Sequence, residues 1–187
     1  VGSEMCIRDS SSPKWLVLDG YEDEPAAFGV PPYVGFHIRY LCGVLEEHNV
    51  DYRYMTIDQW REFVRQKGES GVDNLMRSID GFACIAGAVV PGKYLRGTPI
   101  SLNEMSNIVR GLPNGIPAIL GGWAIRGWRQ QGWNPLRKNL FLAVQDTDAT
   151  LDNYLNSGQW KHCRRTAEQW TKSVSYTHLR AHETRTY

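Results

Sequence analysis

Short apolar runs that end at glycine or aspartate alternate along this chain with segments of helical periodicity, and this alternation constrains the fold more than any other feature. The predicted strands are 15–18, 52–57, 82–86, 116–120 and 140–144. Runs of this length with β-branched and aromatic residues are typical of buried strands. Since strands separated by helices pair in parallel, we predict an α/β fold with a mainly parallel five-stranded sheet and helices on both faces.

Helical periodicity fills the stretches between these runs. The expected helices are 33–47, 58–67, 72–79, 101–110, 148–155 and 157–170, with glycines separating the second from the third. Ser101 and Glu104 have the spacing of a capping box. Asp148 or Thr150 is the expected cap of the fifth helix, and Ser157 that of the sixth. No internal repeat or linker divides the pattern, so we expect one domain.

The two ends of the chain are a matched pair of peptides. Residues 1–9, VGSEMCIRD, and residues 174–182, VSYTHLRAH, can be encoded by opposite strands of a single DNA sequence. This match resembles a sequencing adapter that was read through at both ends of a short insert. We therefore expect 1–10 and 174–187 to be adapter-derived and not natural protein. The natural domain is then 11–173, truncated on both sides.

Composition excludes several classes of protein. The formal net charge is +1, which provides no electrostatic basis for binding nucleic acid or an anionic membrane surface. No apolar run reaches the length of a transmembrane helix. Outside the predicted adapter the cysteines are Cys42, Cys84 and Cys163, an odd number without paired spacing. This pattern favours a reducing, cytoplasmic location and gives no disulfide framework and no metal site.

The loop after the first strand is the first candidate binding segment. In parallel α/β sheets, ligands bind beyond the carboxyl ends of the strands. This loop is long, acidic and rich in proline, and such loops are often functional. Its candidate residues are Asp19, Gly20, Asp23, Glu24, Pro31, Pro32 and Tyr33. The acids would receive ligand hydroxyls or a cation. The alternative is a solvated turn in which Asp19 accepts a hydrogen bond from its own backbone.

The loops after the third and fourth strands are further candidates. Gly87 opens the third-strand loop, where Lys93 would meet a phosphate or carboxylate and Tyr94 follows it. The alternative is an exposed loop lysine. Gly121 and Gly122 would let a ligand lie against the backbone, or would simply form a tight turn.

Three tryptophans, Trp123, Trp128 and Trp133, recur every five residues after the fourth strand. This spacing fits neither a helix face nor a strand face, and packing or an interface is favoured over base stacking. The dinucleotide-binding fingerprint, the phosphate loop and the acceptor aspartate of receiver domains are all absent from the positions where they would be needed.

The opening of the predicted domain resembles a family of radical SAM proteins best known from archaea. The resemblance is carried by VLDGYEDEPA at 17–26, GVPPY at 29–33 and Arg39-Tyr40, with weaker matches at 54–58, 85–87, 91–94 and 121–122. It implies a flavodoxin-like, Rossmann-like doubly wound domain similar to cobalamin-binding domains. The binding positions it implies are Asp19, Gly20, Asp23, Glu24, Pro31, Pro32, Tyr33, Arg39, Lys93 and Tyr94.

The resemblance also implies what the rest of such a protein would contain. A radical SAM barrel would follow, with a CxxxCxxC motif for a [4Fe–4S] cluster that cleaves S-adenosylmethionine. A helix-hairpin-helix region near the C-terminus would be the only contact with nucleic acid. Neither element is in this sequence, and the Asp-x-His-x-x-Gly motif of cobalamin binding is absent. The expectation is an accessory domain without catalytic residues; the alternative is a stand-alone flavodoxin-like binding or interaction module.

Overall fold

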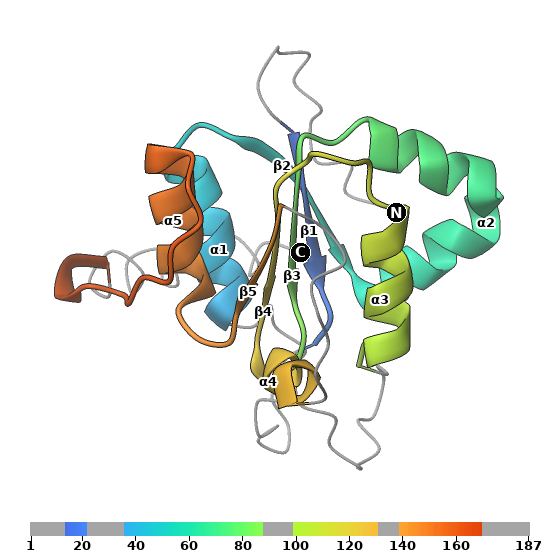
Figure 1. Cartoon of the computed structure of the whole chain (residues 1–187). Helices are drawn as coiled ribbons and strands as arrows, with labels where there is room; N and C mark the ends of the chain where they lie inside the picture. Colours follow the sequence, from blue (N-terminus) through green and yellow to red (C-terminus); the bar gives the residue numbers. More distant parts are fainter. Residues whose placement is uncertain (1–13, 22–35, 88–98, 131–138, 170–187) are drawn as a thin grey trace, which may run out of the picture.

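The computed structural model describes residues 14–21, 36–87, 99–130 and 139–169, and these form a three-layer α/β domain (Figure 1). One five-stranded sheet has the order β2-β1-β3-β4-β5, and all four strand pairs are parallel. The strands are β1 (Lys14–Asp19), β2 (Asp51–Thr56), β3 (Gly81–Ile85), β4 (Ala118–Gly121) and β5 (Leu140–Ala143). The helices are α1 (Phe36–Glu47), α2 (Ile57–Arg77), α3 (Leu102–Gly111), α4 (Trp123–Gln130) and α5 (Thr147–Ser157). The predicted flavodoxin-like α/β fold is confirmed.

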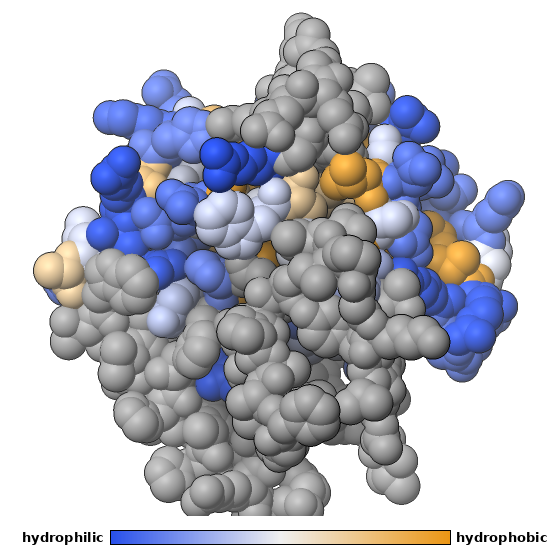
Figure 2. All heavy atoms as spheres, turned by 90° about the horizontal axis from the view of Figure 1, so that it is seen from below, coloured by the Kyte–Doolittle hydropathy of each residue, from blue (hydrophilic) through white to orange (hydrophobic). Residues whose placement is uncertain are grey.

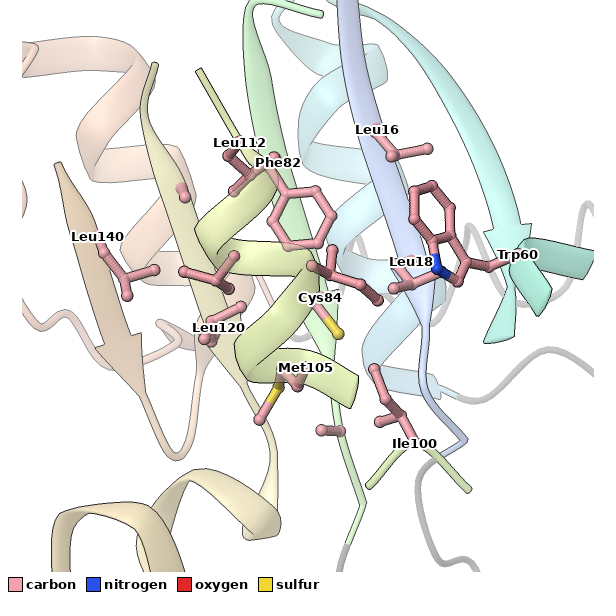
Figure 3. Close-up of a cluster of buried hydrophobic side chains, with 14 of the residues drawn as sticks. Leu16, Leu18, Trp60, Phe82, Cys84, Ile100, Met105, Leu112, Leu120 and Leu140 are labelled. Atoms are coloured by element: carbon pink, nitrogen blue, oxygen red, sulfur yellow. The ribbon is translucent and has the colours of Figure 1, made fainter. Parts of the chain in front are cut away.

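The sheet is buried on both faces, because helices cover each side. Helices α1 and α5 lie on one side of the sheet, and α2 and α3 lie on the other (Figure 1). Side chains of β1 alternate between the two layers: Trp15 and Val17 pack toward α1 and α5, whereas Leu16 and Leu18 pack toward α2 and α3. Figure 3 shows the second cluster, in which Phe82 stands among leucines of several strands. This two-sided burial explains why the strands are continuous apolar runs.

Two sequence predictions about the helices on the α2–α3 face are confirmed. Helix α2 is interrupted at Gly68, whose φ of 63° and ψ of −169° are not helical, as expected from the glycines in this stretch. Helix α3 begins at a complete capping box, in which Ser101 accepts from the backbone of Glu104 and Glu104 accepts from the backbone of Ser101.

The predicted caps of α5 are wrong. The N-cap residue is Asp146, in a left-handed conformation without a side-chain cap bond. Asp148 and Thr150 lie inside the helix, and both are buried. Their side chains accept hydrogen bonds from the segment that follows: Asp148 from the Arg165 guanidinium, and Thr150 from the backbone N–H of Cys163. Tertiary partners therefore decide the role of both residues.

The predicted helix over 157–170 is also wrong. Ser157 ends α5, Gly158 turns left-handed with φ of 69°, and residues 159–166 are not helical. The chain turns back here because Trp160 stacks between two aromatic rings, with centroids 5.4 Å from Phe141 and 3.9 Å from Tyr154. Residues 167–169, the last ones described, are helical.

Helix α4 was not expected, since the tryptophan spacing obscured it. Ala124 and Ile125 are buried against the α2–α3 layer, whereas Trp123 is 46% exposed and has the Arg126 guanidinium 6.0 Å from its ring centroid. Trp133 and the side chain of Trp128 lie outside what the structure describes, so the predicted tryptophan interface stays a prediction. None of the described helices has the length and apolar character needed to cross a bilayer.

Candidate functional site at the carboxyl edge of the sheet

The ends of β1 and β3 lie side by side at the centre of the sheet. Asp19 is the last residue of β1, and its Cα partner on β3 is Ile85. The chain order reverses here, since β2 lies on one side of β1 and β3 on the other. In doubly wound sheets a ligand site forms beyond the strand ends at such a switch point. The sequence prediction of a site after β1 and β3 therefore corresponds to one position in the fold.

Asp19 is buried at this edge, with 5% of its surface exposed. Its Oδ1 accepts from the backbone N–H of Tyr21 at 2.9 Å, and its Oδ2 accepts from the Tyr54 hydroxyl at 2.9 Å. Burial and the charge of Asp19 raise the pKa of Tyr54, so this hydroxyl stays a neutral donor. The hydrogen bond from the local backbone to Asp19, which the alternative interpretation of this loop predicted, is thus present in the structure.

Backbone hydrogen bonds tie the β1 end to the segment between β3 and α3. Gly20 donates to the Ile85 carbonyl at 2.8 Å, and the Gly20 carbonyl accepts from Ile100 at 3.0 Å. The Tyr21 carbonyl accepts from Gly87 at 3.1 Å. Both ends of the segment 88–98 are therefore attached to two successive residues, and the segment 22–35 departs from the same place. The two loops singled out in the sequence begin at one point.

Several predicted site residues belong to those two segments. Asp23, Glu24, Pro31, Pro32, Tyr33, Lys93 and Tyr94 lie outside the described residues. Arg39 is described; it lies in the first turn of α1 and is partly exposed.

Three glycines of the predicted site, Gly20, Gly121 and Gly122, lie where neighbouring elements pack closely. A Cβ on Gly20 would lie 2.4 Å from the Ile100 side chain. A Cβ on Gly121 would lie 2.1 Å from Thr147 Oγ1. Gly122 has φ of 93°, and its Cβ would lie 2.1 Å from the Ala86 carbonyl oxygen. Close approach between neighbouring elements requires glycine at these positions.

A polar network that the sequence analysis did not assign flanks the edge. The Tyr21 hydroxyl donates to Asp58 Oδ2 at 2.9 Å, and Arg61 donates to Asp58 Oδ1 at 2.9 Å. Arg61 also donates from Nε and Nη2 to the two carboxylate oxygens of Glu104, at 2.9 and 3.0 Å. We call Tyr21, Asp58, Arg61 and Glu104 the edge network. A Thr56–Gln59 capping box begins α2 and sets Asp58 in its first turn, and this motif was the available signal.

Electrostatics within the edge network favour the charged form of Glu104. The hydrogen bonds from Arg61 are the largest influence, and those from the Ser101 backbone and side chain add to them; together they outweigh burial and lower the pKa of Glu104 to about 2. The Glu104 carboxylate is thus an acceptor for both a helix N-terminus and a guanidinium.

Glu104→Gln is expected to flatten the acid limb of the stability curve. A depressed folded-state pKa contributes stability above the unfolded value, near 4.3, and that contribution disappears as pH falls toward 2. Because the side chain is 38% exposed, we expect only about 0.5–1 kcal/mol near neutral pH. Urea unfolding of both proteins between pH 2 and 7 measures this. Curves that stay parallel throughout would show that Glu104 has no linked protonation.

The described residues that flank the edge are largely hydrophilic (Figure 2). Seen from below, hydrophilic residues dominate the two flanks of the molecule, interrupted by smaller apolar groups (Figure 2). A shallow groove between α2 and α3 is lined by Trp60, Val64 and Ile108 together with members of the edge network. Within the described ranges, no group of three or more His, Cys, Asp or Glu side chains could hold a metal ion.

Comparisons with known proteins give similarity to archaeal sequences. The chain is 44% identical over 94 residues to an uncharacterized protein of Methanocaldococcus jannaschii, and 41% identical over 92 residues to one of Archaeoglobus fulgidus. The matches cover 50% and 49% of this chain but 16% of each relative, so the chain spans only a small part of their length. No protein-family profile and no solved structure matches the chain.

Proposed function

We propose that this domain is a non-catalytic accessory domain of a larger cytoplasmic radical SAM protein, and that its carboxyl sheet edge faces a ligand or the catalytic barrel of the same chain. The [4Fe–4S] cluster and S-adenosylmethionine would be held by that barrel. The proposal rests on the resemblance of the opening motif, and it is consistent with archaeal relatives several times longer than the matched segment.

The cysteines of the described residues do not supply the cluster in that proposal. Cys42 and Cys84 are buried on opposite faces of the sheet, and Cys163 is far from both in sequence. Burial raises the pKa of the Cys84 thiol, which disfavours the thiolate that iron ligation requires. Cobalamin is not part of the proposal, since the histidine motif is missing. Contact with nucleic acid is proposed only for a region beyond this chain.

One observation carries the role of the edge. The loop with Asp23 and Glu24 follows Tyr21, and both ends of the loop with Lys93 and Tyr94 are hydrogen-bonded to Gly20 and Tyr21, at the switch point of the sheet. An acidic loop and a loop with a lysine that share one origin can bracket a polar ligand.

The test uses the uninterrupted gene from the source DNA, expressed without oxygen. We expect bound iron and sulfide, and reductant-dependent cleavage of S-adenosylmethionine to methionine and 5′-deoxyadenosine. Asp23→Ala and Lys93→Ala should each lower this rate roughly tenfold, equivalent to about 1.4 kcal/mol, with unchanged melting temperature. Asp73→Ala and Lys161→Ala are the matched controls, because both side chains are exposed on the described surface.

Two results would contradict the proposal. A full-length protein without a cysteine cluster motif and without iron would remove the radical SAM assignment and leave the stand-alone binding module. A fall in melting temperature that accompanies the loss of cleavage in the Asp23 and Lys93 variants would instead assign these residues a structural role.

A further inference from the structure

We infer that the edge network, with Arg61 at its centre, is a positioning device that fixes the end of β1 against both ends of the β3–α3 segment. The inference rests on the proposed function only in treating this edge as the ligand edge. No sequence motif assigned Arg61, Asp58 or Tyr21 a role.

Tyr21 has an unusual backbone conformation that several contacts maintain. Its φ is 60°, a left-handed value that is uncommon for a bulky residue and persists only where surrounding contacts determine it. Its N–H donates to Asp19, its carbonyl accepts from Gly87, and its hydroxyl donates to Asp58. Tyr21 is thus held through its N–H, its carbonyl and its hydroxyl, and the hydroxyl supplies the hydrogen bond to α2.

Arg61 joins the elements that surround Tyr21. Its guanidinium donates to carboxylates from two different helices, Asp58 on α2 and Glu104 on α3, and Nη2 also lies 3.3 Å from the Pro99 carbonyl oxygen. A planar guanidinium can hold several acceptors in fixed directions, which an ammonium cannot. Arg61 therefore connects α2, α3 and the residue that precedes Ile100.

Together these contacts close a ring around the edge. Tyr21 leads through Asp58 to Arg61, Arg61 leads to Pro99, and Ile100 returns through its N–H to the Gly20 carbonyl. A change at any member should therefore be transmitted to the backbone bonds that attach Gly87 and Ile100 to β1. Arg61 is a positioning residue, since it acts through these bonds.

Amide hydrogen exchange in the full 187-residue chain tests the inference. Tyr21→Phe removes only the hydroxyl and should accelerate exchange of the Gly87 and Ile100 amides by roughly tenfold. The Phe82 and Ala118 amides, which bond at the opposite end of the sheet, should keep their wild-type rates. Tyr52→Phe is the matched control, because it removes a hydroxyl that donates to Glu46 away from the edge.

Arg61 variants separate positioning from charge. Arg61→Met should accelerate the Gly87 and Ile100 amides at least as much as Tyr21→Phe, and Arg61→Lys should restore protection only in part, since lysine lacks the planar fork. Equal acceleration of all four amides would assign the network to global stability and overturn the inference. Unchanged exchange at Gly87 and Ile100 would also overturn it.

The exchange experiment needs no ligand, cluster or activity. Its outcome is therefore independent of the proposed function. A full-length protein without iron would remove the radical SAM assignment and leave the exchange result standing, whereas a confirmed cluster would not rescue the inference if exchange did not respond.

Discussion

Arg165→Met is expected to lower the free energy of unfolding by about 3–5 kcal/mol, because it leaves the Asp148 carboxylate buried without a partner. The two side chains are 2% and 5% exposed, and Arg165 Nε and Nη2 lie 2.8 and 2.6 Å from the two carboxylate oxygens. The guanidinium also lies 4.3 Å from the Tyr40 ring centroid, a cation–π contact that methionine loses.

Urea unfolding of Arg165→Met beside Arg164→Met measures this effect. Arg164 is the exposed neighbour, so its replacement should change stability by less than about 0.5 kcal/mol. The double variant Asp148→Leu with Arg165→Met should recover part of the loss, since replacing both charges removes the unpaired carboxylate. Similar losses in the Arg164 and Arg165 variants would show that the ion pair does not hold the segment.

This ion pair attaches the segment after α5 to the helix. Residues 159–166 have no regular structure, yet Arg165 bonds into α5 and Trp160 stacks on β5 and α5. Gln169 and His48 both bond to Asp152 on the same helix. The described segment after α5, residues 159–169, is therefore packed against α5 and β5.

The sheet and most helices were predictable because local patterns encode them. Because both faces of the sheet are buried, Leu16 to Leu18 and Phe82 to Ala86 are continuous apolar runs. Such runs can be recognised in the sequence without knowing which strands they pair with. The Ser101–Glu104 box is likewise a local motif. The same local patterns gave the wrong prediction around Trp160. The residues around it have helical periodicity, but its stacking partner Phe141 is distant in sequence.

The place of the candidate residues in the fold was predictable, but their contacts were not. The apolar run that ends at Asp19 placed this residue at the carboxyl end of β1. Its partner Tyr54 is 35 residues away, and Arg61 reaches Glu104 across 43 residues. Such pairings depend on which strands and helices become neighbours, and a single sequence does not encode this locally.

Gly122→Ala is expected to cost about 2–5 kcal/mol, the sum of a left-handed backbone penalty and overpacking. At φ of 93° the new Cβ would lie 2.1 Å from the carbonyl oxygen of Ala86, which is backbone and cannot rotate away. That same carbonyl accepts from Ala124 at the start of α4, so the clash would disturb the β3 end and α4 together.

Two other glycines separate the contributions. Gly158 has a φ of 69°, but a Cβ added there would meet open space. Gly158→Ala should therefore lower the free energy of unfolding by only about 1–2 kcal/mol. Gly111→Ala has neither positive φ nor a close neighbour and should be neutral or stabilising by up to about 1 kcal/mol. Chemical unfolding of the three variants measures the series. If Gly122→Ala unfolded no more easily than Gly158→Ala, close packing against Ala86 would not explain this glycine, and access of a ligand to the backbone would become the better account.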